Sequence, residues 1–304
     1  MSNKPILITG GTGFLGSALT FKWLQEDQPV TIFSRSADKV QRAFGNRVQA
    51  VTRTEDLPDA SSYRAVVNLA GAGIFDQRWS EARKQVLRES RIDFTRQLAN
   101  WINRSVSPPD VLINGSAIGF YGDQGDALLT ELSSPQVDFS QQLCADWEQA
   151  ALQAEAGGTR VCLIRTGLVL GRDGGLLKRM LLPFRFGLGG RLGRGDQWMS
   201  WVHIHDWLAI VQAMIDNPTM RGAYNATAPI PVTNTEFSNC LAGVLNRPLL
   251  LPLPEFALKL LLGEMAALVL GSQRVIPQRL LDQGHVFEFT QLDVALRNLL
   301  LPAQ

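Results

Sequence analysis

The sequence predicts an α/β protein in which helices cover both faces of a parallel sheet, and three observations lead to this prediction. Residues 5–9 form a short apolar run of β-forming residues, which is typical of a strand buried on both faces. Apolar residues then recur at helical spacing from Leu15 to Trp23, which gives a helix one apolar stripe. Strand and helix patterns keep alternating after that, which indicates right-handed crossovers and a doubly wound sheet.

Short apolar runs predict further strands in the first half of the chain, at residues 30–34, 48–52, 65–69, 111–117 and 161–165. After Gly167 the pattern changes to glycine-rich loops, scattered prolines and several helices, with one more strand expected at residues 198–204. We therefore expect a main domain at residues 1–166 and a smaller, mainly helical substrate-side domain at residues 167–304. Extended folds of this kind often return a strand from the second region to the main sheet.

The composition excludes several classes of protein. With 304 residues, 45% of them hydrophobic, and a formal net charge of +1, the chain has no basic field for nucleic acid. Its three cysteines show no CxxC spacing, so we expect neither disulfides nor a zinc site. No export signal is evident, and the apolar residues 256–270 are too short and interrupted to span a membrane. We expect a cytoplasmic protein in which residues 256–270 pack on the chain itself or contact a partner.

The loop between the first predicted strand and the first predicted helix is rich in glycine. Residues 9–16 read Thr-Gly-Gly-Thr-Gly-Phe-Leu-Gly. Gly10 permits a tight turn out of the strand, Gly13 leaves room for a pyrophosphate, and Gly16 lets the helix pack closely on the sheet. Backbone amides at the helix start, aided by its dipole, then face the phosphates. The alternative is an ordinary strand-to-helix turn, but the position after a buried strand favours a Rossmann dinucleotide site.

The end of the second strand predicts which dinucleotide binds. An NAD site places a carboxylate there to hold the ribose diol, whereas this chain has Ser34 and Arg35. A guanidinium can clamp a 2′-phosphate that a carboxylate would repel, so the sequence favours NADP(H). The alternative is that Arg35 is a solvated surface arginine.

Several phrases resemble the extended short-chain dehydrogenase/reductases, which include nucleotide-sugar epimerases. These are the glycine loop, Asn-Leu-Ala-Gly at residues 68–71, Ser116 after the fifth strand, and Gly-Ala-Tyr-Asn at residues 222–225. More narrowly, the chain resembles an atypical branch, the "epimerase family", which has its own C-terminal region. The phrases that carry this second resemblance lie at residues 89–95, 115–122, 165–171, 187–190, 262–264 and 277–280.

The resemblance implies a set of cofactor contacts beyond the glycine loop. Arg91 follows the fourth strand and would supply a second cation near the phosphates, although an ion pair with Glu89 is the alternative. The expected cofactor-binding residues are Gly10, Thr12, Gly13, Phe14, Leu15, Gly16, Ser34, Arg35, Leu69, Ala70, Gly71 and Arg91.

The catalytic residues are where this sequence departs from the wider family. There a Tyr, and a Lys four residues later, lie on the helix after the fifth strand, and the pair exchanges a proton as hydride moves. Here Ser140 and Cys144 stand at those positions, so that dyad is absent. Ser116 remains a candidate to bond a substrate carbonyl, with Tyr121 as a candidate acid. Alternatively, Ser116 satisfies backbone groups and Tyr121 only packs its ring.

The substrate side departs as well. In nucleotide-sugar epimerases an arginine before the segment matching residues 202–206 grips the substrate diphosphate, and Met199 stands there in this chain. Arg185, Arg191 and Arg194 offer other cations for an anion, or lie in a solvated loop.

The segment around residue 204 contains residue types that bind metals. His203 and His205 are two apart on an expected strand, so their rings should point to opposite faces, and Asp206 should cap a helix that begins at Trp207. We expect no metal site.

Three functions are compatible with this sequence. The first is an NADP(H)-dependent reductase or epimerase-like oxidoreductase that acts on a small carbonyl or hydroxyl substrate held between the two domains. The second is a non-catalytic NADP(H)-binding regulator or redox sensor, which the missing dyad favours. The third is a structural module with a vestigial nucleotide loop. The oligomeric state stays open.

Overall fold

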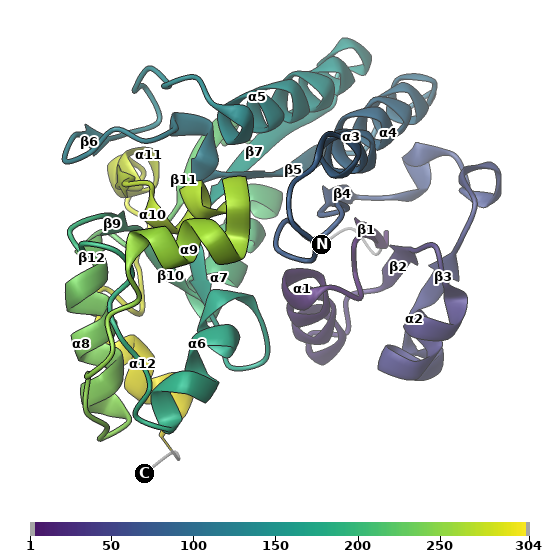
Figure 1. Cartoon of the computed structure of the whole chain (residues 1–304). Coiled ribbons are helices and arrows are strands. Elements are labelled where there is room, and N and C mark those ends of the chain that lie inside the picture. The colour runs from purple at the N-terminus through teal and green to yellow at the C-terminus, as the bar shows by residue number, and fades with distance from the viewer. Residues whose placement is uncertain (1–3, 302–304) are drawn as a thin grey trace.

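The computed structural model describes residues 4–301 and contains a sheet of seven parallel strands (Figure 1). The order across the sheet is β3-β2-β1-β4-β5-β7-β11, so the predicted doubly wound α/β fold is confirmed. The strands are β1 (Ile6–Thr9), β2 (Val30–Phe33), β3 (Gln49–Val51), β4 (Ala65–Asn68), β5 (Val111–Ala117), β7 (Arg160–Thr166) and β11 (Gly222–Ala226).

Helices cover both faces of this sheet because successive residues of each strand point to opposite sides. Ile6 and Ile8 of β1 pack in one core with helices α1 (Phe14–Gln25), α2 (Ala37–Phe44) and α7 (Ile204–Asp216). Leu7, between them, belongs to the core on the other face, with α4 (Phe94–Asn103) and α5 (Phe139–Leu152). Helix α3 (Glu81–Arg88) lies beside α5.

The strand order reverses between β1 and β4. From β1 the chain goes to β2 and β3 on one side, whereas β4, β5 and β7 lie on the other. Ligands of open α/β sheets bind in the crevice at this point, outside the carboxyl ends of the strands. The fold therefore places the loop after β1 where a dinucleotide is expected.

The second half of the chain builds its own core beside the sheet, on the side away from β3 (Figure 1). β8 pairs with β10, β9 with β12, and β13 with the short β6. β11 crosses the boundary expected at residue 166, because it comes from this half and yet pairs with β7. The other elements are β6 (Leu128–Leu129), β8 (Leu168–Leu170), α6 (Gly175–Arg185), β9 (Trp198–Met199), β10 (Trp201–His203), β12 (Val232–Thr233), α8 (Asn234–Val244), α9 (Glu255–Leu262), α10 (Ala267–Leu270), β13 (Arg274–Val275), α11 (Gln278–Asp282) and α12 (Leu292–Leu300).

The strand predicted at residues 198–204 differs from the structure. It is split into β9 and β10 at Ser200, and α7 already begins at Ile204. His203 caps α7, so its ring and that of His205 lie edge to face at 4.8 Å and do not diverge. Asp206 does not cap a helix start: its carboxylate accepts the backbone N–H groups of Glu288 and Phe289 at 2.8 and 3.0 Å. Both expectations were wrong because the strand ends at His203 and α7 begins three residues before the predicted start at Trp207.

Residues 256–270 fold as α9, a 3-10 turn (Gly263–Ala266) and α10, and the chain breaks at Gly263, whose φ is +60°. Leu258 and Met265 are buried, whereas the side chains of Phe256 and Leu260 are 73% and 74% exposed. In residues 4–301 no helix combines the length and apolarity needed to cross a membrane.

We predict that His203 makes stability depend on pH. Burial, and then the neighbouring His205, lower the pKa of His203 to about 4. The unfolded chain protonates this histidine near pH 6.5 while the folded chain keeps it neutral, so the folded state binds fewer protons. The free energy of unfolding should therefore fall, by on the order of 2 kcal/mol, as the pH drops from about 6.5 to about 4.

Urea unfolding at several pH values checks this prediction. His203→Asn keeps a capping side chain and should flatten the pH dependence over that window. His205→Asn, at the exposed neighbour, removes only the smaller cause of the lowered pKa of His203 and should reduce the pH dependence much less than His203→Asn. Equal slopes for His203→Asn and the wild-type chain would refute the assignment.

Candidate active site

The loop between β1 and α1 needs glycine for steric reasons that the structure makes explicit. Gly10 has φ +68°, and a Cβ there would lie 2.5 Å from the carbonyl oxygen of Leu69. A Cβ on Gly16 would lie 2.3 Å from the carbonyl oxygen of Gly10. The loop, the end of β4 and the start of α1 therefore touch through their backbones, which only glycine allows.

The first turn of α1 offers hydrogen-bond donors without a competing acceptor from a side chain. Gly13 is the N-cap residue of α1, and no side chain caps the backbone amides at this end of the helix. The first turn contains no acidic residue. Thr12 precedes this cap, and Phe14 and Leu15 begin the helix. The positive end of the helix dipole and the uncapped amides are suited to an anion.

The end of β2 carries the predicted phosphate clamp. The amide of Ser34 donates to the carbonyl of Val51 at 2.9 Å, and Ser36 caps α2 by accepting the amide of Lys39. Between them Arg35 is exposed, and it makes no ion pair with any residue from 4 to 301. Its guanidinium is therefore free to meet a ligand.

Arg91 lies beside the loop after β4. Its guanidinium donates to the carbonyls of Ala72 at 3.0 Å and Leu87 at 3.4 Å, and it packs over the ring of Trp147. A Cβ on Gly71 would lie 2.9 Å from this guanidinium, so the loop residues Leu69, Ala70 and Gly71 pass close to it. The alternative ion pair with Glu89 is not formed, since Glu89 accepts from Gln85. A π-helical turn, a feature frequent at functional sites, carries Arg91.

A buried polar chain that sequence reasoning missed joins the ends of β1 and β4 to the middle of β5 and to α4. Thr9 donates to the Asn68 side-chain oxygen at 2.6 Å. The Asn68 amide donates to Thr95 at 2.8 Å and to Asn114 at 2.6 Å. These bonds satisfy the polar groups at the crevice and fix the spacing of its strands. The available sequence signal was that Asn68 and Asn114 each follow a run of apolar β-forming residues.

Ser116 belongs to a second buried network. Its hydroxyl donates to Glu148 at 2.6 Å, and Arg165 grips the same carboxylate with two bonds of 2.8 Å. Arg165 also donates to the Tyr121 hydroxyl at 3.1 Å, which donates to Asn225 at 2.6 Å. All five side chains are buried. Glu148, Arg165 and Asn225 were not predicted as site residues.

The electrostatics of this network follow from the ion pair at its centre. Burial alone would lower the pKa of Arg165, but the bonds and charge of Glu148 raise it above its usual value, so the guanidinium stays charged. Glu148 is then an acceptor only, and the Ser116 hydroxyl points its proton at Glu148 and its lone pairs elsewhere. Burial raises the pKa of Tyr121.

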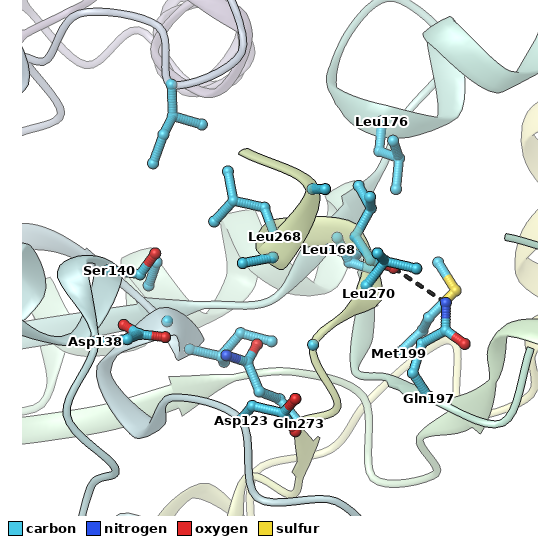
Figure 2. A pocket seen from close by; sticks show the side chains of 18 of the residues that line it. Asp123, Asp138, Ser140, Leu168, Leu176, Gln197, Met199, Leu268, Leu270 and Gln273 are labelled. Carbon is cyan, nitrogen blue, oxygen red and sulfur yellow. Dashed lines mark hydrogen bonds between the residues drawn. The ribbon is translucent and has the colours of Figure 1, made fainter. Parts of the chain in front are cut away.

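A cavity of about 1050 Å³ opens at the carboxyl ends of β5 and β7 (Figure 2). Ser116 lines it, as do Ser140, Cys144 and Arg91, whereas Tyr121 does not. Burial raises the pKa of Cys144 to about 12, so its thiol stays neutral. Ser116 therefore lines the same cavity as Ser140 and Cys144, which stand where the wider family has its Tyr and Lys. Tyr121 does not line this cavity. Among residues 4–301 no cluster of histidine, cysteine and carboxylate groups could hold a metal ion.

The fold and the glycine loop define a nucleotide-binding α/β protein of the extended short-chain dehydrogenase/reductase type. Residues 6–226 match the model of the NAD dependent epimerase/dehydratase family, and residues 253–299 match a domain of unknown function, DUF1731. The chain belongs to the NAD dependent epimerase/dehydratase family. Its resemblance to a branch with its own C-terminal region is confirmed.

Curated relatives and solved structures agree with this assignment. The chain is 40% identical to the epimerase family protein Mb2239 of Mycobacterium bovis over 97% of both chains. It is 37% identical to the chloroplastic homolog of epimerase family protein SDR39U1 of Arabidopsis thaliana, over 97% of this chain and 86% of the relative. The crystal structure of human epimerase family protein SDR39U1 (isoform2) with NADPH superposes with a TM-score of 0.87 at 33% identity, over 97% of this chain and 98% of that one. UDP-glucuronic acid 4-epimerase from Bacillus cereus, 16% identical with a TM-score of 0.77, shares the fold.

We predict that the Glu148–Arg165 pair is costly to break. Glu148→Gln preserves the shape but leaves the buried guanidinium without its counter-charge, which should lower the free energy of unfolding by roughly 3 kcal/mol. Asp146→Asn, on the same helix, breaks an exposed ion pair with Arg88 and should cost less than about 1 kcal/mol. Denaturant unfolding measures both. Similar losses for the two variants would contradict this account of the site.

Proposed function

We propose that this protein is an NADP(H)-dependent oxidoreductase, a reductase or epimerase-like enzyme that acts on a carbonyl or hydroxyl substrate in the cavity beside Ser116. One observation carries the proposal: the uncapped first turn of α1 sits at the crevice of the sheet, behind glycines that leave no room for a side chain. The human relative, crystallised with NADPH, supports the choice of cofactor.

Each part of the cofactor has a matching group on the chain. The uncapped amides at the start of α1 would hold the pyrophosphate, and Arg35 with Ser34 would hold the 2′-phosphate. Leu69, Ala70 and Gly71 would line the path toward the nicotinamide, with Arg91 behind them. Bound NADPH supplies a hydride; the protein orients it and the substrate.

Ser116 is the residue that we propose to contact the substrate. Its proton is directed to Glu148, so its oxygen presents lone pairs to the cavity and can accept a hydrogen bond from a substrate hydroxyl. Tyr121 holds Arg165 in place, and it could act as a proton donor only if its hydroxyl left Asn225 and turned to the cavity. A cytoplasmic location stays a prediction.

A second function is favoured by one observation, the neutral and buried Cys144 at the position of the family's lysine. A site without a group that exchanges protons at neutral pH suits a regulator that binds NADP(H) and reports its redox state to a partner. The two functions share the cofactor site and differ in turnover.

Arg35→Ala tests the cofactor choice. Loss of a charge-assisted bond worth about 1.5–3 kcal/mol should weaken NADPH binding by roughly tenfold or more and leave NADH binding unchanged. Arg42→Ala, an exposed arginine on α2, is the matched control and should bind NADPH like the wild type. Titration by protein fluorescence gives both affinities. Unchanged NADPH affinity in Arg35→Ala would remove this clamp from the proposal.

Turnover separates the enzyme from the regulator. We expect the wild-type chain to oxidise NADPH with members of a panel of aldehydes and ketones, followed by absorbance. Ser116→Ala should lower kcat/KM for the reverse reaction, the oxidation of the corresponding alcohols by NADP+, by roughly a hundredfold, because the substrate hydroxyl loses the acceptor that Ser116 provides. Ser140→Ala, the other serine lining the cavity, should stay near wild type. Tight NADPH binding without oxidation by any carbonyl would favour the regulator.

A further inference from the structure

The wall of the cavity is apolar over a large part of its surface. Figure 2 shows leucine side chains from separate segments turned toward one another, with Met199 beyond them. They come from the strand after β7, from α6, from the loop before β9 and from α10, so segments far apart in sequence converge on one space. The residues are Leu168, Leu176, Leu192, Met199, Leu268 and Leu270.

The charged groups at the cavity do not suit an anion. Three cationic side chains line it against five carboxylates. Two of the cations are already paired, Arg194 with Asp196 at 2.9 Å and Lys259 with Glu255 at 2.7 Å. The third, Arg91, is held in place by bonds to the backbone carbonyls of Leu87 and Ala72 and packs over the ring of Trp147.

The polar rim is acidic. Asp123 and Asp138 are exposed and lie together with Gln273 and Ser140 on the side opposite the leucines (Figure 2). A diphosphate would meet like charge there, and the only cation of the lining without a carboxylate partner is Arg91, which is held by backbone carbonyls. An uncharged ligand is not repelled by these carboxylates and does not need a cation to bind.

A roof over the cavity limits its contact with water. α9, α10 and the turn between them line it, and Arg78, from the loop after β4, bonds the carbonyls of Leu260 and Leu261. Lys84 of α3 pairs with Glu264 at 2.6 Å. Both contacts tie the C-terminal region to the nucleotide-binding half, so the apolar wall lines a partly covered space in which burial of apolar surface stabilises a ligand.

We infer that the cavity binds an uncharged, predominantly apolar ligand that carries a hydroxyl or carbonyl group, and that it does not bind nucleotide-diphosphate sugars. The polar group of the ligand lies toward Ser116, and its apolar body lies against the leucine wall. This inference deepens the proposed function and rests on it only for the reaction, because ligand binding is measurable without cofactor.

The test uses N-phenyl-1-naphthylamine, a neutral apolar dye whose emission rises in a dry site. The full-length chain should bind it saturably, and millimolar UDP-glucose should not displace it. Leu268→Asp places a charge in the wall and should weaken dye binding by roughly tenfold or more. Leu260→Asp, at an exposed position of α9, should stay within about twofold of wild type, since its side chain points to solvent. Should Leu268→Asp fail to fold by circular dichroism, Leu268→Gln makes the same comparison.

Displacement of the dye by UDP-glucose, absence of saturable dye binding, or equal affinity in Leu268→Asp and wild type would overturn the inference. A parallel NADPH titration separates it from the proposed function. NADPH binding without dye binding would refute only the inference of an apolar site. Dye binding that depends on Leu268, without NADPH binding, would support the apolar site and refute the proposed cofactor.

Discussion

The architecture of the site depends on one backbone contact, in which the start of α1 presses against the loop that leaves β1. The missing Cβ of Gly16 would sit 2.3 Å from the carbonyl oxygen of Gly10, so the helix can approach the sheet only because no side chain intervenes. This approach aims the amides of the first helical turn into the crevice between β1 and β4. A larger residue at either position would push the helix away and disperse those donors.

Two buried polar networks keep the strand ends in register around that crevice. The Thr9, Asn68, Thr95 and Asn114 chain holds β1, β4 and β5. The ion pair of Glu148 with Arg165 holds α5 to β7 and directs the proton of Ser116. Such a pair contributes little net stability, but removing one partner leaves a buried charge. Its value here is orientation, because it decides which way the serine faces the cavity.

The glycine loop, most strands and the apolar face of α1 could be predicted from sequence because each depends on local constraints. The loop needs the conformational freedom of glycine, and the strands and the helix are visible in the spacing of apolar residues. The Glu148–Arg165 pair could not, because its partners lie 17 residues apart on different elements and nothing local shows that they meet. A signal existed in the spacing of Ser140, Cys144 and Glu148, which at intervals of four share one helix face. The interruption of the predicted strand at Ser200 could not be seen in the sequence, because the Ser200 hydroxyl bonds the backbone of Gln273 and Val275, both distant in sequence. The roof of the cavity could not be predicted either, because it is held by contacts between residues far apart in sequence, such as Arg78 with Leu260 and Lys84 with Glu264.

The central claim is that the backbone donors of the first crossover bind a dinucleotide phosphate. Calorimetry of NADPH binding to the wild-type chain and to Gly13→Val tests it most directly. A Cβ at residue 13 would lie 3.2 Å from the carbonyl oxygen of Gly10, a tight contact that a small shift relieves, and it would occupy space near the expected pyrophosphate. We expect saturation at one NADPH per wild-type chain and a large loss of affinity in a folded Gly13→Val. No heat from the wild type, or equal affinity in both, would contradict the account.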